Sequence, residues 1–285
     1  MGIERTQWRE RTAAHLERAD ALTAVWRASR AAGRAHPIDD FLFTYYGSSA
    51  SLLRRWHPGE GVALLDAADA PHRAWRWYGA GDAPGSVVAD AAAFRVEKAP
   101  LVAAIARILR GTMSRPGQWG CFGMHEWAMV YRADETRHPV PLRLGRAGTD
   151  AVVEASALRC THFDAFRFFT PAAAPRNAAV LTRDGQAATE QPGCLHAGMD
   201  LVKWAMKLGP LVPGELLLDA FALARDIRWL DMAASPYDVS AWGAVAVEVE
   251  TAAGRAEYAR RQREFAERAA PIRAALAQIA DPSRR

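Results

Sequence analysis

Long segments in which apolar residues recur every three or four positions constrain the fold of this chain more than any other sequence feature. That spacing puts the apolar side chains on one face of an α-helix, where they can pack against a core. Glycine and proline residues at the ends of these segments supply plausible stops. The predicted long helices cover residues 4–33, about 195 to 208, 215–232 and 255–279.

The segments between the long helices predict shorter elements. A helix is expected from about Ala99 to Leu109, and Gly111 is interpreted as its end. Runs rich in valine and leucine bounded by turn residues favour short strands. Such strands are expected near residues 62–65 and 87–88, at 140–144 and 151–154 with a hairpin-like turn at 145–148, and at 245–249.

No internal repeat, low-complexity tract or Pro/Ser-rich linker divides the 285 residues. A chain of this length can bury a large core. We therefore predict an α+β, mainly α fold, with residues 1–285 forming a single compact helical domain that carries a small antiparallel β element. Its parts are the N-terminal helix at 4–33, a helical and β core at 36–249 and the C-terminal helix at 255–279.

The charge balance permits a polyanionic partner such as DNA without requiring one, because 36 Lys and Arg against 32 Asp and Glu give a formal charge of +4. Three cysteines, an odd number, argue against a disulfide framework and suit a reducing cytosol. The first twenty residues lack the apolar region of a signal peptide, and no apolar run approaches a membrane span. We therefore expect a cytoplasmic protein with no membrane contact and no obligate protein partner.

Three segments, at residues 119–127, 160–171 and 191–200, place imidazole and carboxylate groups among or near large apolar side chains. Burying an ionisable group beside apolar surface costs several kcal/mol unless the group is paired. We therefore predict that these segments form the walls of one site.

Glu126 and Asp164 are the candidate catalytic carboxylates. An apolar setting would raise a carboxylate pKa and suit a general acid, whereas a nearby cation such as Arg167 would keep it ionised. Hydrolysis of an N-glycosidic bond uses such a carboxylate, because the sugar acquires oxocarbenium character as water attacks. His125 or His162 would assist proton transfer. The alternative for Asp164 and Arg167 is an ordinary ion pair one helical turn apart.

Aromatic side chains near these groups could hold a nucleobase by stacking. Arginine beside tryptophan, as at residues 54–56, can clamp a nucleotide, although an arginine packed on a surface ring is the alternative. The predicted substrate-binding residues are Tyr45, Arg54, Trp56, Trp127, Phe163, Phe168, His196 and Asp200.

A metal site is the alternative interpretation of the same histidines. His162 and Asp164 with a distant histidine resemble the two-His-one-carboxylate ligand set of iron enzymes. The sequence lacks CxxC and HExxH, and its spacing matches no closed zinc site. The alternative ligand set is His125, His162, Asp164 and His196, holding a divalent metal such as iron or zinc; the hydrolytic route needs no cofactor.

Other common motifs of catalysis are absent from the sequence: it has no GxSxG elbow, no GxxxxGK[ST] loop and no GxGxxG turn after a strand. Residues 231–238 are interpreted as a helix end and proline turn whose carboxylates are expected to cap a loop; the alternative is that they reach back to the site.

A set of distinctive segments lies at residues 36–46, 53–59, 120–131, 141–145, 161–171, 190–205 and 230–238. Together these segments resemble a group of actinobacterial proteins commonly labelled 3-methyladenine DNA glycosylase, and the resemblance spans most of the chain. It implies a DNA-repair hydrolase that acts on alkylated DNA or on a free nucleoside. No catalytic motif carries over residue by residue, so the resemblance implies an activity and no catalytic assignment. A metal-dependent enzyme of small-molecule metabolism, such as an oxidoreductase, and a non-catalytic binding module are the other hypotheses.

Overall fold

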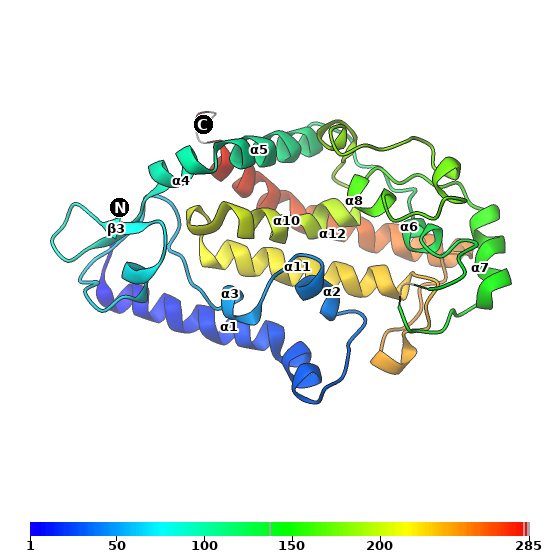
Figure 1. Cartoon of the computed structure of the whole chain (residues 1–285), viewed down its shortest axis with the longest axis horizontal. Coiled ribbons are helices and arrows are strands. Elements are labelled where there is room, and N and C mark those ends of the chain that lie inside the picture. The colour runs from blue at the N-terminus through cyan, green and yellow to red at the C-terminus, as the bar shows by residue number, and fades with distance from the viewer. Residues whose placement is uncertain (137, 282, 284–285) are drawn as a thin grey trace.

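A bundle of long helices forms the body of the protein in the computed structural model, which describes residues 1–136, 138–281 and 283. Helix α10 packs against α11 and α12, α5 packs against α12, and α1 lies along α11 (Figure 1). All four predicted long helices are confirmed within a few residues. The bounds are α1 (Arg5–Ala31), α5 (Ala99–Met113), α10 (Leu195–Leu208), α11 (Gly214–Ala233) and α12 (Ala252–Ala280).

The apolar spacing that predicted these helices also decides which faces they bury. In α10, Leu195, Met199 and Val202 are all less than 5% exposed, and they lie on the stripe that the sequence marks as apolar. In α11, the buried Leu223, Ile227 and Leu230 repeat the pattern. Burial of such side chains is the main favourable term for each helix, at about 1.5–3 kcal/mol per large residue.

Short helices connect the long ones and carry much of the site described below. The α-helices are α2 (Asp40–Thr44), α3 (Ala50–Leu53), α4 (Ala91–Glu97), α6 (Met124–Ala128), α7 (Gly145–Glu154), α8 (Phe163–Phe166) and α9 (Gln186–Thr189). The 3-10 helices are η1 (Pro71–Ala74), η2 (Ala174–Arg176), η3 (Gly209–Leu211) and η4 (Ser240–Trp242).

A small sheet lies at the opposite end of the bundle from α6 and α7 (Figure 1). Its strand order is β1-β2-β4-β3, with β2 and β4 at the two positions where the sequence predicted strands near 62–65 and 87–88. The β2–β4 and β3–β4 pairs are antiparallel as predicted, whereas β1 pairs with β2 in parallel. The strand bounds are β1 (Gly2–Ile3), β2 (Ala63–Leu64), β3 (Tyr78–Ala80) and β4 (Val87–Ala89).

The strands predicted at 140–144 and 151–154 are wrong, and so is the hairpin turn between them. Residues 145–154 form helix α7, with Thr149 and Val153 buried four residues apart as a helix requires. Four-residue apolar runs cannot separate a strand from part of a helix, which explains the error. Leu142 makes only an isolated bridge to Tyr237.

Two further predictions are corrected by contacts between distant segments. Helix α5 runs through Gly111, where an added Cβ would lie 2.2 Å from the carbonyl oxygen of Ala187, so this glycine permits close packing and does not end the helix. Residues 245–249 form no strand in the part of the chain described. The Val247 amide donates instead to the carbonyl of Ala233 at the end of α11.

The described residues include no helix whose length and apolar character would suit a membrane span. Cys121, Cys160 and Cys194 are all free thiols, in line with the predicted absence of a disulfide framework.

His57 packs among aromatic rings beside the small sheet. Its Nδ1 lies 2.8 Å from the hydroxyl of Tyr78, and its ring stacks on that tyrosine at 5.8 Å between centroids. Burial, reinforced by the neighbouring His72, lowers the pKa of His57 from 6.5 to about 3. The folded protein therefore keeps this imidazole neutral at mildly acidic pH.

We predict that His57 makes stability depend on pH between about 6.5 and 3. The unfolded chain binds a proton at His57 near pH 6.5, whereas the folded chain does so only near pH 3. Above pH 6.5 neither state binds this proton, so His57 does not lower stability there. Below pH 6.5 only the unfolded chain binds it, and the free energy of unfolding falls by about 1.4 kcal/mol per pH unit. Urea denaturation of the wild type and of His57→Gln at pH 7.5 and pH 5 measures this effect. The wild type should lose about 2 kcal/mol more than the variant; an equal loss in both would contradict the prediction.

Candidate functional site

A cavity of about 800 Å³ opens beside α2, α8, α10 and α11, and residues from all three predicted wall segments line it. Glu126 comes from the first segment, Asp164 from the second and His196 from the third. Three other residues singled out in the sequence also line it, namely Tyr45, Arg167 and Phe168. Three segments far apart in the sequence therefore meet at one place.

Aromatic rings form an apolar part of the cavity wall. Phe41 and Tyr45 stack with centroids 4.9 Å apart, and Tyr45 meets Phe168 edge-on at 6.4 Å. Burial raises the pKa of Tyr45, so its hydroxyl remains protonated at neutral pH. Tyr46 and Trp242 line the same cavity. A planar ring entering this space would find flat apolar faces on more than one side.

The carboxylate of Asp164 is surrounded by three cations. Arg167 Nε lies 3.1 Å from its Oδ1, Arg183 Nη2 lies 3.6 Å from the same oxygen, and Lys203 Nζ lies 3.4 Å from its Oδ2. The predicted one-turn pairing of Asp164 with Arg167 is confirmed, because Asp164 is in α8 and Arg167 caps that helix. The ion pair offered as the alternative is therefore present, although its carboxylate is not on the open surface, because Asp164 is only 8% exposed.

A buried network joins α6 to α11 behind one wall of the cavity. His125 Nε2 lies 2.8 Å from Asp231 Oδ1, and Arg228 Nη1 donates to Asp231 Oδ2 at 2.9 Å and to Glu126 Oε1 at 2.7 Å. Burial alone would lower the pKa of His125, but the Asp231 carboxylate outweighs burial and raises that pKa well above its usual value. The pKa of Asp231 falls in return, because its cationic partners outweigh the effect of burial.

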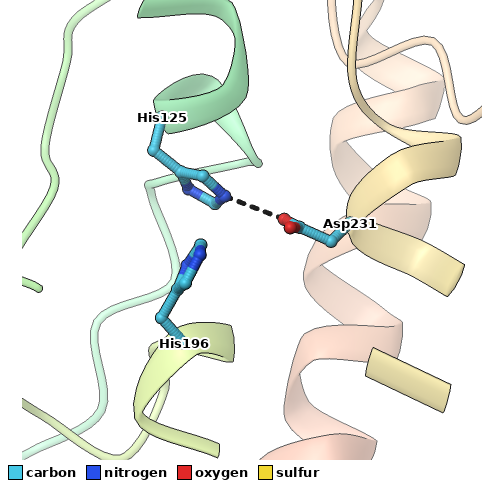
Figure 2. A group of neighbouring side chains, drawn as sticks. All are labelled: His125, His196 and Asp231. Carbon is cyan, nitrogen blue, oxygen red and sulfur yellow. Dashed lines mark hydrogen bonds and ion pairs between the residues drawn. The ribbon is translucent and has the colours of Figure 1, made fainter. Parts of the chain in front are cut away.

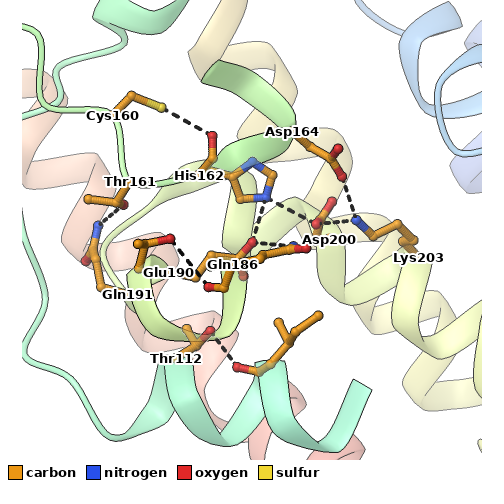
Figure 3. Close-up of polar contacts among 12 residues, drawn as sticks. Thr112, Cys160, Thr161, His162, Asp164, Gln186, Glu190, Gln191, Asp200 and Lys203 are labelled. Carbon is orange, nitrogen blue, oxygen red and sulfur yellow. Dashed lines mark hydrogen bonds and ion pairs between the residues drawn. The ribbon is translucent and has the colours of Figure 1, made fainter. Parts of the chain in front are cut away.

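A second buried network lies between the end of α9 and α10 (Figure 3). His162 Nε2 lies 3.2 Å from both Asp200 Oδ2 and Glu190 Oε1. Lys203 Nζ donates to the same Asp200 Oδ2, and the hydroxyl of Tyr46 donates to Asp200 Oδ1 at 3.1 Å. Burial raises the pKa of Glu190, whereas Asp200 keeps the pKa of Lys203 raised despite burial.

His196 lies between the two networks and faces the cavity. Its ring centroid is 4.4 Å from that of His125 and 5.2 Å from that of His162. Among the described residues its imidazole makes ring contacts but no hydrogen bond. Burial, and then the charge of His125, lower the pKa of His196 well below the usual value, so this ring is neutral.

Several predicted site residues lie outside the cavity. Trp127 is completely buried and donates to the carbonyl of Ala234, while Trp56 is buried in the small core beside the sheet and donates to Glu215. Arg54 pairs with Asp20 of α1. These three cannot contact a ligand in the cavity, because packing or ion pairs hold them elsewhere. Four other predicted site residues are also absent from the described residues that line the cavity, namely Phe163, His125, His162 and Asp200.

The predicted metal-ligand set is divided by the structure. His125 and His196 group with Asp231, while His162 groups with Glu190 and Asp200. Within each group, one nitrogen or oxygen of each residue lies within 4.8 Å of the other two. Asp164 belongs to neither group, because its carboxylate faces Arg167 and Lys203 instead.

Sequence reasoning missed Asp231, Arg228, Glu190 and Tyr46. Asp231 was assigned to a loop cap, but it is fully buried inside α11 and bonded to His125. The sequence did carry a signal for Arg228 and Asp231: they lie three residues apart on one helix, and the residues directly beside each of them are apolar. Such a charged pair is expected to be buried, and buried charges need further polar partners.

Neither a protein-family model nor a curated protein nor a solved structure matches the chain. Geometry alone therefore defines the class of site: a cavity walled by aromatic rings, with a carboxylate held among cations and two buried His–carboxylate networks behind it.

Proposed function

We propose that the chain is a hydrolase that cleaves the N-glycosidic bond of a nucleobase-containing substrate in this cavity. The observation that carries the proposal is that Asp164 lines the same cavity as the rings of Tyr45 and Phe168. Such a site places a carboxylate within reach of a sugar while the attached base lies against flat apolar faces. A cavity of about 800 Å³ falls in the range typical of small-molecule sites.

The chemistry requires a group that stabilises a cationic sugar and activates water. As the C–N bond breaks, its electron pair leaves with the base and positive charge develops on the sugar. Asp164 lies among three cations and can face that charge or take a proton from the attacking water. Lys203 remains protonated, because Asp200 raises its pKa, and can donate a hydrogen bond to the departing base.

Asp164 suits this role better than Glu126. Glu126 is 5% exposed, and its Oε1 accepts from the fully buried Arg228, so its carboxylate anchors the wall. His125 and His162 do not line the cavity and point their Nε2 atoms at buried carboxylates. We therefore assign direct proton transfer to neither histidine.

The cations around the cavity suit a phosphorylated substrate. The side chains of Arg167 and Arg183 are 39% and 66% exposed, so they remain accessible to a ligand from solvent. Arginine binds phosphate through two parallel N–H donors. This arrangement fits either a free nucleotide or a nucleotide flipped out of DNA.

Base release tests the proposal directly. Purified protein is incubated with an alkylated duplex oligonucleotide and, separately, with nucleosides and nucleotides, and free base is measured by chromatography. We expect release from at least one of these classes. Folded protein that binds such compounds tightly but releases no base would identify a binding module and contradict the proposal. DNA retention that weakens steeply with salt would favour a DNA substrate over a free nucleotide.

A further inference from the structure

We infer that His125, His196 and Asp231 form a site for one divalent transition-metal ion, such as zinc or iron, at the inner wall of the cavity. The three side chains come from α6, α10 and α11 and point toward one another (Figure 2). All three are at least 94% buried, and their nearest donor atoms lie within 4.8 Å of one another. The inference does not depend on the identity of the substrate.

The types of donor in this group fit such an ion. Two imidazole nitrogens and one carboxylate oxygen are the protein ligands of many catalytic zinc and non-haem iron sites, which keep a further position open for water or substrate. Of the three side chains His196 lines the cavity, whereas His125 and Asp231 lie behind it. A bound ion would supply an activated water there.

His196 offers a ring that makes no hydrogen bond within the described part of the chain, and it lines the cavity, so its nitrogens are available to a ligand there. His196 is only 6% exposed, and the described residues offer its ring nothing but ring contacts. Coordination of an ion would engage one ring nitrogen of His196. The ion would also replace the proton on His125 Nε2 that now lies between His125 and Asp231, releasing it to solvent.

Arg228 holds the carboxylate of Asp231 from its other side. Its Nη1 donates to Oδ2 of Asp231, whereas Oδ1 is the oxygen that faces His125. A partner behind the coordinating group fixes its orientation and is a common feature of metal sites in proteins. Arg228 therefore does not occupy Oδ1, the oxygen that would coordinate the ion.

The second group, His162 with Glu190 and Asp200, differs in this respect. Lys203 Nζ donates to Asp200 Oδ2, the oxygen that also faces His162 Nε2 (Figure 3). The ammonium group therefore already occupies the place beside the carboxylate that a metal ion would take. Glu190 Oε1 in addition accepts from Gln186 Nε2 at 2.6 Å. Only the first group is assigned as a metal site.

Cobalt(II) and zinc binding to untagged protein, stripped with chelator, test the inference without any substrate. We expect one equivalent of Co²⁺ to bind with visible d–d absorption and to be displaced by Zn²⁺. His196→Gln should weaken binding at least tenfold, whereas His57→Gln, which alters a histidine beside the sheet, and His162→Gln, which alters the second group, should retain it. Absence of stoichiometric binding, or wild-type affinity in His196→Gln, would overturn the inference.

A measurement on the wild type guards against a variant that fails to fold. Anomalous scattering from crystals grown with Co²⁺ should place the ion between His125, His196 and Asp231. An ion found only elsewhere would overturn the assignment. Because no turnover is measured, these results are independent of the test for base release.

Discussion

Replacement of Arg228 by methionine is expected to lower the free energy of unfolding by about 3–5 kcal/mol, because the buried Glu126 would lose its cation and the buried Asp231 would lose one of its cationic partners. Arg228 is 1% exposed and donates to Glu126 at 2.7 Å and to Asp231 at 2.9 Å. Methionine has a volume similar to that of arginine, so the decrease in the free energy of unfolding comes mainly from the uncompensated charges and not from a cavity. Urea denaturation at neutral pH measures the change.

Arg225→Met is the matched control for this variant. Arg225 lies on the same helix, but its side chain is 35% exposed and pairs with Asp226 at 3.6 Å. Surface pairs of this kind contribute about 0–1 kcal/mol. A double-mutant cycle with Glu126→Gln should show coupling between Arg228 and Glu126. Equal, small losses in Arg228→Met and Arg225→Met would show that the buried network does not stabilise the fold.

Asp164→Asn is expected to lower the rate of base release about a thousandfold, the size typical of losing a catalytic carboxylate. Asparagine keeps the shape of the side chain and removes the charge that would face the sugar cation. Arg167 and Arg183 beside it are partly exposed, and Lys203 keeps Asp200 as its partner, so the free energy of unfolding should change by no more than about 1–2 kcal/mol. Rates of base release under single-turnover conditions, with thermal unfolding in parallel, measure both effects.

Two further variants make this result specific. Asp219→Asn removes a surface carboxylate that pairs with Arg18 at 2.7 Å, and its rate of base release should match the wild type. Glu126→Gln tests the other predicted carboxylate, and a larger loss of rate in this variant than in Asp164→Asn would move the catalytic role to Glu126. A wild-type rate in Asp164→Asn would remove Asp164 from the reaction.

The candidate site was predictable where a single segment carried the signal. Glu126, Asp164 and His196 each lie near large apolar side chains, and the expectation that such groups share a site agrees with their common cavity. The same reasoning wrongly predicted that Trp127 and Trp56 bind substrate. An aromatic residue that is next to a polar one in the sequence can point into the core instead. Side-chain direction depends on the packing of whole elements, which local sequence does not record.

The long helices follow from the sequence alone, because their hydrogen bonds are local and their apolar stripes repeat with the helical period. Contacts between residues far apart in the sequence were decided only by the tertiary structure. Gly111 lies inside a helix, where its missing side chain lets Ala187 approach closely, and His125 meets Asp231 across 106 residues. A buried charge is stable only with its partner, and the partner's position is set by how the helices pack, so the two buried networks became visible only in three dimensions.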